Sequence, residues 1–196
     1  MTPHEIIIGY ARKFVPLSEE EAMQFGAAFR EVKINKRQFI VQPGFVARSR
    51  WFVIQGALRG YVVGDAGEDH TIQLAIEEWW ISDYNSYIFQ QPASMFVVAL
   101  EDCVLLQISH EDEKQLKAMN HAFETFFRIL GERSTASMQR RIISNHTKTA
   151  EERYQYFLEK YPLMVERLPQ YVVASFLGMS TEFLSKIRNQ KVRRKS

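Results

Sequence analysis

The sequence predicts an α+β protein: an N-terminal antiparallel β-roll of the jelly-roll kind, then a long helix, then a helix-turn-helix. Three observations predict it. Short β-rich runs alternate with turn sequences from Glu31 to about Ile108, apolar residues after Ser109 recur at helical spacing, and the last third is helical throughout. With 196 residues, 46% of them hydrophobic and 24% charged, the composition is that of a folded globular chain.

The N-terminal part begins with a short helix and continues into strands. Ser18 is a helix-capping residue, Glu21 stands at the third position after it, and apolar residues follow at helical spacing as far as Phe29. The turn residues Pro43-Gly44 and 64–69 then separate short apolar runs. The predicted strands are Phe39–Val41, Trp51–Ile54, Leu58–Val63, Thr71–Leu74, Phe96–Leu100 and Val104–Ile108.

A heptad pattern follows the last of these strands. Ser109 is a predicted cap, and the helix after it is expected to continue to about Asn145. The apolar seam predicts a dimer contact along this helix, formed by Leu116, Met119, Phe123, Phe126 and Leu130. The seam turns polar beyond Leu130 unless its register shifts onto Met138 and Ile142. Packing of the same stripe on the chain's own β domain is the alternative.

The C-terminal third carries a helix-turn-helix pattern. Val173, Ala174 and Leu177 are apolar at helical spacing, and Gly178 suits the left-handed backbone that ends a helix. Ser180 caps the next helix, whose side chains predicted to face inward are Phe183, Leu184 and Ile187. The side chains predicted to read DNA from this second helix are Ser180, Thr181, Glu182, Ser185, Lys186, Arg188 and Asn189.

The charge distribution supports a polyanion as partner of the C-terminal part. Residues 1–117 hold 11 basic and 16 acidic side chains, a balance of −5, whereas residues 118–196 hold 14 and 7, a balance of +7. Residues 180–196 alone hold six basic side chains against Glu182. Chance clustering of solvated charges on an exposed terminal helix is the alternative.

In this order of elements the chain resembles the cyclic-AMP receptor protein and fumarate-nitrate regulator (Crp/Fnr) superfamily of bacterial transcription factors. The residues that carry the resemblance are Phe52-Val53-Ile54-Gln55-Gly56-Ala57-Leu58-Arg59-Gly60-Tyr61, Ala150-Glu151-Glu152-Arg153-Tyr154, and the segment from Phe176 to Arg188. The resemblance implies a homodimer that binds double-stranded DNA. We expect a cytoplasmic location, because the first residues lack the basic and then apolar pattern of a signal peptide. The resemblance divides the chain into a cyclic-nucleotide-binding-like sensor (1–115), a dimerisation helix (116–146) and a DNA-binding domain (147–196).

The resemblance also identifies a cassette that in relatives holds a cyclic nucleotide. In these relatives the Glu of a Gly-Glu pair binds the ribose hydroxyl. The Arg of an Arg-Ser pair, together with backbone amides, binds the cyclic phosphate. Aligned without gaps, Ser82-Asp83 and Ala93-Ser94 stand at these positions, and Tyr84 adjoins them. Because Ala93 replaces the arginine, we expect no binding of cyclic AMP. The effector, if one exists, stays unknown, and we expect no cofactor.

Other classes of function find less support in the sequence. The single Cys103 cannot hold an iron-sulfur cluster, and the five histidines lack the spacing of a metal site, so a cupin-like enzyme is disfavoured and we expect no enzymatic activity. No apolar run is long enough for a membrane span. A second hypothesis is a small-molecule-binding or protein-interaction module with a degenerate DNA-binding domain. The sequence feature behind it is the short segment after Asn189, which leaves no room for a full β-hairpin wing.

Overall fold

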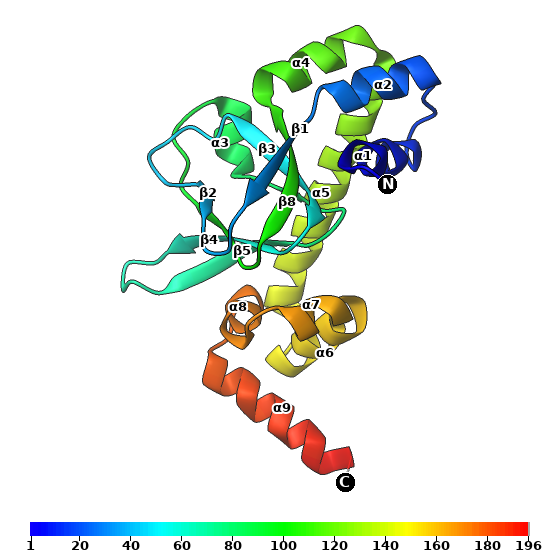
Figure 1. Ribbon diagram of the computed structural model, residues 1–196. Helices are drawn as coiled ribbons and strands as arrows, with labels where there is room; N and C mark the ends of the chain where they lie inside the picture. Colours follow the sequence, from blue (N-terminus) through cyan, green and yellow to red (C-terminus); the bar gives the residue numbers. More distant parts are fainter. Residues whose placement is uncertain (196) are drawn as a thin grey trace.

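The computed structural model describes the backbone of residues 1–195 and the side chains of residues 1–189 (Figure 1). The strands are β1 (Arg30–Ile34), β2 (Phe39–Val41), β3 (Ser49–Gln55), β4 (Leu58–Val63), β5 (Asp69–Ala75), β6 (Trp80–Ile81), β7 (Phe96–Ala99) and β8 (Cys103–Ser109). The helices are α1 (Pro3–Arg12), α2 (Glu19–Ala27), α3 (Tyr84–Phe89), α4 (His110–Met119), α5 (His121–Thr147), α6 (Ala150–Lys160), α7 (Pro162–Arg167), α8 (Gln170–Phe176) and α9 (Thr181–Lys195). Within the described backbone, no helix combines the length and apolar character that a membrane span requires.

The strands form a roll of two four-stranded sheets, in the orders β1-β8-β3-β6 and β2-β7-β4-β5. Every pairing is antiparallel, which confirms the predicted sheet type. Alternate residues of each strand point into the space between the sheets, where Trp51, Val53, Leu58 and Leu105 belong to one apolar core. All six predicted strands are present.

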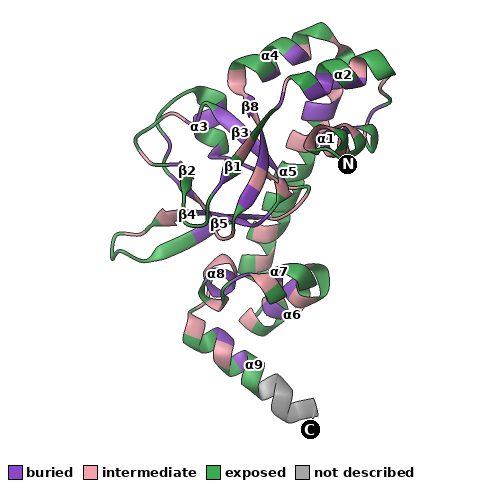
Figure 2. Ribbon diagram, in the orientation of Figure 1, coloured by how far each residue is buried: buried purple, intermediate pink, exposed green. Residues whose placement is uncertain are grey.

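A second core joins the outer face of the first sheet to helices α1, α2, α4 and α5. Phe52 of β3 is fully buried in it together with Phe25 of α2. Helix α5 crosses this face and continues to the C-terminal helices (Figures 1 and 2). Phe126 of α5 meets Phe25 edge-on at 5.2 Å between ring centroids. The N-terminal helices therefore close one side of the roll.

This packing corrects the predicted dimer seam. Leu116, Phe123 and Phe126 are 3%, 0% and 0% exposed within the single chain, so these side chains are core and not an open dimer surface. Leu130 packs against the same core. Met119 is exposed, but it ends α4 and is not part of the long helix.

The predicted unbroken helix is also wrong, because Asn120 interrupts it. The backbone of Asn120 is extended, with φ −153° and ψ 134°, and its side chain caps α5 by accepting the N–H of Ala122 at 2.7 Å. Asparagine competes well for such caps, so the chain turns there although no proline or glycine is present. The long helix begins at His121.

A third core holds the C-terminal helices together and reaches the roll. Phe157 of α6, Val172 of α8 and Leu184 of α9 are buried in it, and so are Ala57 and Leu74 from the β4 and β5 region. The helical bundle is thus packed against the second sheet, while α9 extends away from the roll (Figure 1).

Candidate nucleic-acid interface and effector cassette

Helices α8 and α9 form the predicted helix-turn-helix. Gly178, with φ 66°, ends α8 in the left-handed region, and the N–H of Met179 returns to the carbonyl of Ala174 at 3.0 Å. Ser180 Oγ accepts the N–H of Phe183 at 3.2 Å and so caps α9. Of the three side chains predicted to face inward, Leu184 and Ile187 are buried, but Phe183 is 45% exposed.

The predicted reading residues lie on the accessible side of α9. Ser180, Glu182, Lys186, Arg188 and Asn189 are exposed. Two others, Thr181 and Ser185, are half-buried. The carboxyl of Glu182 is partly engaged at the start of the helix. Hydrogen bonds from the backbone N–H of Glu182 itself and from the Ser180 side chain lower its pKa. The basic side chains predicted at Lys191, Arg193, Arg194 and Lys195 lie outside the described side chains.

Gln170 at the start of α8 positions the middle of the reading helix. Its Nε2 donates to Ser185 Oγ at 2.7 Å, and its Oε1 accepts from Arg188 at 3.4 Å. Arg153 of α6 braces the turn from the other side, with Nε donating to the Leu177 carbonyl at 3.1 Å and Nη1 to the Lys148 carbonyl at 2.8 Å. The helix pair is therefore held at both ends by side chains of the same bundle.

The cassette residues come together, but around a carboxylate of the chain itself. Asp83 Oδ1 accepts the N–H of Ser86 at 3.1 Å and caps α3. Asp83 Oδ2 accepts the N–H groups of Ser94 at 2.9 Å and Met95 at 3.2 Å. Ser94 Oγ lies 3.4 Å from the same oxygen. Asp83 is buried, so these amides serve an internal anion.

The other predicted cassette residues have structural surroundings. Ser82 Oγ donates to the Ser49 carbonyl at 2.9 Å, and Ala93 is buried in the core between the sheets. Tyr84 lies exposed on α3. Met95 also faces the interior, where a Cβ added to Gly60 would lie 3.3 Å from its sulfur. Side chains therefore fill the interior of the roll next to the cassette.

Two buried arginines of the roll point away from its interior. Arg50 of β3 faces the helices, where its guanidinium lies 4.6 Å from the ring centroid of Phe127 and 2.6 Å from the Glu113 carboxylate. Arg59 of β4 faces α8 and donates to Thr71 and Asp69 at 2.8 and 2.9 Å. Strand alternation explains both orientations, because Trp51 and Leu58 occupy the inward positions.

A buried polar group links the cassette helix to α4. Tyr87 of α3 donates from its hydroxyl to Glu113 at 2.7 Å, and Lys117 lies 2.5 Å from the other oxygen of that carboxylate. Burial, and then the charge of Glu113, raise the pKa of the Tyr87 phenol. The paired carboxylate holds α3 and α4 in fixed relation.

Contacts between the roll and the bundle were not predicted. Arg167 of α7 donates to Glu77 at 2.6 and 3.0 Å, and to Glu101 at 2.6 Å. Ser175 of α8 accepts the N–H of Thr71 at 2.8 Å and donates to the Asp69 carbonyl at 2.7 Å. The partners are 66 to 106 residues apart, so no local sequence signal could have paired them.

Comparison with known proteins finds similarity in sequence over part of the chain and in fold over most of it. A family model described as "Cyclic nucleotide-binding domain" matches residues 31–120. No curated protein matched the sequence. Similar solved structures include FixK2 from Bradyrhizobium japonicum, at 15% identity and a TM-score of 0.73, covering 85% of this chain and 86% of that one.

Two further structures extend the likeness. The regulator CLP of Xanthomonas campestris, described as responsive to c-di-GMP, has 16% identity and a TM-score of 0.69 over 91% of this chain and 93% of its own. The catabolite activator protein of Thermus thermophilus has 21% identity and a TM-score of 0.55 over 91% and 85%. Residues 31–120 are therefore similar to the cyclic nucleotide-binding domain, and the chain as a whole has the fold shared by these three solved structures.

Proposed function

We propose that the chain is a DNA-binding transcriptional regulator that reads operator DNA with α9. The observation that carries the proposal is the exposed row Glu182, Lys186 and Asn189 on a capped helix whose opposite side is buried. These side chains can bond to base edges, and Lys186 and Arg188 can also engage phosphates. In this proposal residues 1–115 are the sensor and 147–196 the DNA-binding part.

We place the dimer contact on the second half of α5. Met138, Ile142 and Ile143 are 58%, 53% and 54% exposed there. They replace Leu116, Phe123 and Phe126, which are core residues, and they include the shifted register considered from the sequence. A copy of α5 packed along this stretch would cover an apolar surface that otherwise faces water. Two reading helices in one dimer would meet two half-sites.

The cassette is proposed not to bind cyclic AMP. The amides of Ser94 and Met95 already bond to Asp83, so a phosphate would have to displace a buried carboxylate. Ala93 supplies no cation to help it, and Arg50 and Arg59 face other elements. Both like-charge repulsion and the missing bidentate donor oppose the binding of an anion.

Genome-wide DNA capture with the tagged protein tests the proposal. Wild type is expected to recover a small set of fragments that share a sequence with two-fold symmetry. The double variant Lys186→Ala/Arg188→Ala is expected to lose them. Lys36→Ala, which changes an exposed lysine of the β1–β2 turn, is the matched control and should recover the same set. Equal recovery by wild type and double variant would contradict reading by α9.

A further inference from the structure

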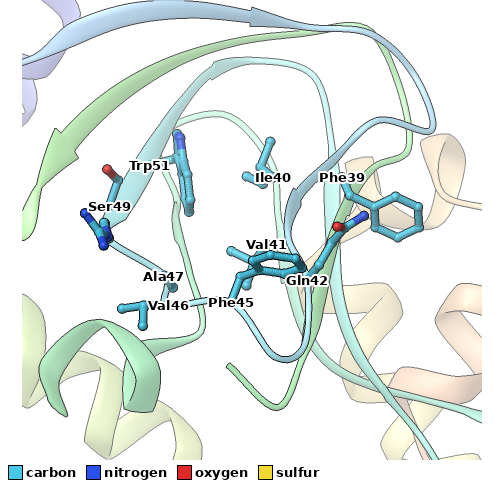
Figure 3. Close-up of a pocket in the computed structure, with 10 residues that line it drawn as sticks. Phe39, Ile40, Val41, Gln42, Phe45, Val46, Ala47, Ser49 and Trp51 are labelled. Carbon is cyan, nitrogen blue, oxygen red and sulfur yellow. The ribbon is translucent and has the colours of Figure 1, made fainter. Parts of the chain in front are cut away.

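A hollow opens at the seam between the two sheets, lined by residues that do not include Asp83. It measures about 370 Å³ and is formed by β2, the loop after it and the start of β3. This size falls within the range of small-molecule sites. Seven of its ten lining residues are apolar: Phe39, Ile40, Val41, Phe45, Val46, Ala47 and Trp51. Figure 3 shows Trp51 and Val41 around this hollow, with Phe45 beside Val41.

The polar side chains of the lining favour an anionic group on the ligand. Arg48 is exposed and makes no hydrogen bond or ion pair with any other described side chain. Ser49 Oγ accepts from Gln107 at 2.8 Å, which leaves its hydroxyl hydrogen available to a ligand. Gln42 adds an amide at the rim. One unpaired cation beside an apolar wall is complementary to a carboxylate with an apolar body.

The exposed ring of Phe45 adds apolar surface at the rim of the hollow. Phe45 is 70% exposed and lies beside Val41, whereas the ring of Phe39 points away from the hollow (Figure 3) and packs 5.6 Å from the ring of Phe96. An apolar ligand body seated against Trp51 would remove part of the Phe45 surface from water. Burial of apolar area gains roughly 25 cal/mol per Å², so this ring provides a source of affinity.

The loop that lines the hollow is hydrogen-bonded to the cassette. The Phe45 carbonyl accepts the N–H of Ala93 at 2.9 Å, and the N–H of Gly44 donates to the Ala93 carbonyl at 3.0 Å. Ala47 donates its N–H to Ser86 Oγ of α3 at 2.8 Å. Helix α3 is in turn tied to α4 through Tyr87 and Glu113. A ligand at the loop would therefore contact a segment that is hydrogen-bonded to the cassette and to α3.

We propose that this hollow binds a small carboxylate with an apolar body, and that this ligand, in place of a cyclic nucleotide, is the effector of the regulator. The effector role rests on the proposed DNA-binding function. The binding site itself does not, because it is defined by Arg48 and the apolar wall.

Calorimetry on the full chain with 4-phenylbutyrate tests the site. We expect saturable binding that Arg48→Gln weakens about tenfold, the value of one charge-assisted bond of about 1.4 kcal/mol. The neutral 4-phenylbutyramide should bind wild type as weakly as the acid binds Arg48→Gln. Phe45→Ala changes an exposed ring, should leave folding intact and should weaken binding several-fold. Arg30→Gln, an exposed arginine of β1 outside the lining, is the control.

Nuclear magnetic resonance locates the ligand. The indole N–H signal of Trp51, identified by its loss in Trp51→Phe, should shift on titration. Absence of saturation, equal affinity in Arg48→Gln, or shifts confined to Tyr84 and Ser94 would overturn the site.

Fluorescence anisotropy on a captured DNA fragment tests the effector role. The carboxylate should change the DNA affinity of wild type but not of Arg48→Gln. Unchanged affinity with bound ligand would overturn the effector role alone. If wild type bound no DNA, the proposed function would fail, while calorimetry would still decide the site.

Discussion

The carboxylate of Asp83 accepts the backbone N–H of Ser94 at 2.9 Å, so a buried side chain of the protein bonds to an amide of its own cassette. Three backbone N–H groups, from Ser86, Ser94 and Met95, converge on this one buried residue. The Ser82-Asp83 pair that suggested a ligand site is therefore part of the structure of the roll.

Asp83→Ala should destabilise the fold by about 2–4 kcal/mol, because it removes a helix cap and leaves buried amides without an acceptor. Urea unfolding measures the change. Asp102→Ala is the control, since that exposed carboxylate accepts one backbone N–H, from Lys36, and its loss should cost about 0.5–1 kcal/mol. Equal costs in the two variants would show that the Asp83 network contributes nothing special.

Cyclic AMP and cyclic GMP should not bind in the micromolar range. The internal carboxylate and the absence of an arginine at Ala93 both oppose a phosphate. Isothermal calorimetry on the wild-type chain checks this directly. Micromolar affinity for either nucleotide would overturn the interpretation of Asp83 as an internal anion.

Arg167→Ala should weaken the docking of the bundle on the roll. The guanidinium bonds to Glu77 and Glu101, but all three side chains are about one-third exposed, so we expect a loss of only about 1 kcal/mol. Arg12→Ala, which breaks one surface pair with Glu19, should cost less than about 0.5 kcal/mol.

The stability lost in Arg167→Ala should depend on pH. Burial raises the pKa of Glu77, but hydrogen bonds from Arg167 and from the N–H of Gly56 lower it by a larger amount. The pKa of Glu77 is therefore below its usual value. A lowered folded-state pKa stabilises the fold above the unfolded pKa of about 4.3, and this contribution disappears as the pH falls through the folded value. Urea unfolding should therefore show that wild type and Arg167→Ala differ at pH 7 and converge as the pH falls through the lowered pKa of Glu77. A constant difference would exclude this ion pair as the cause.

Gly178→Ala should cost about 1–2 kcal/mol, because the turn residue has φ 66° while a new Cβ would meet no atom within 4 Å. The cost is therefore purely conformational. Gly9→Ala is the matched control: it lies inside α1 with equally open space, and alanine should stabilise it by about 0.5–1 kcal/mol. Thermal unfolding of the two variants should move in opposite directions, and a neutral Gly178→Ala would contradict the left-handed turn.

The sequence was informative wherever a local pattern determined the structure. Strand alternation and turn residues predicted the strands, and the cap at Ser180 with Gly178 predicted the helix pair. It failed where tertiary packing decided the outcome. The spacing of Phe123 and Phe126 fits a dimer seam and a core stripe equally well. Phe25 contacts both rings within the same chain, which shows that they belong to the core.

Two further failures have different physical origins, one local and one long-range. Asn120 ends a helix through a side-chain bond to the backbone, which competes with an apparently continuous heptad pattern. The bonds from Arg167 to Glu77 and Glu101 join side chains far apart in the chain. The sequence identified the cassette position and its missing arginine, but not that Asp83 bonds to the amides of Ser94 and Met95.

The salt dependence of DNA binding tests the central claim most directly. Fluorescence anisotropy with a captured fragment gives the logarithm of the binding constant against that of the salt concentration, and each phosphate contact contributes a slope of about −0.9. Wild type should show a steep slope, and Lys186→Ala/Arg188→Ala should bind more weakly with a slope shallower by about 1.8, while Lys36→Ala matches wild type. Binding that does not change with salt, or an unchanged slope in the double variant, would contradict DNA recognition through α9.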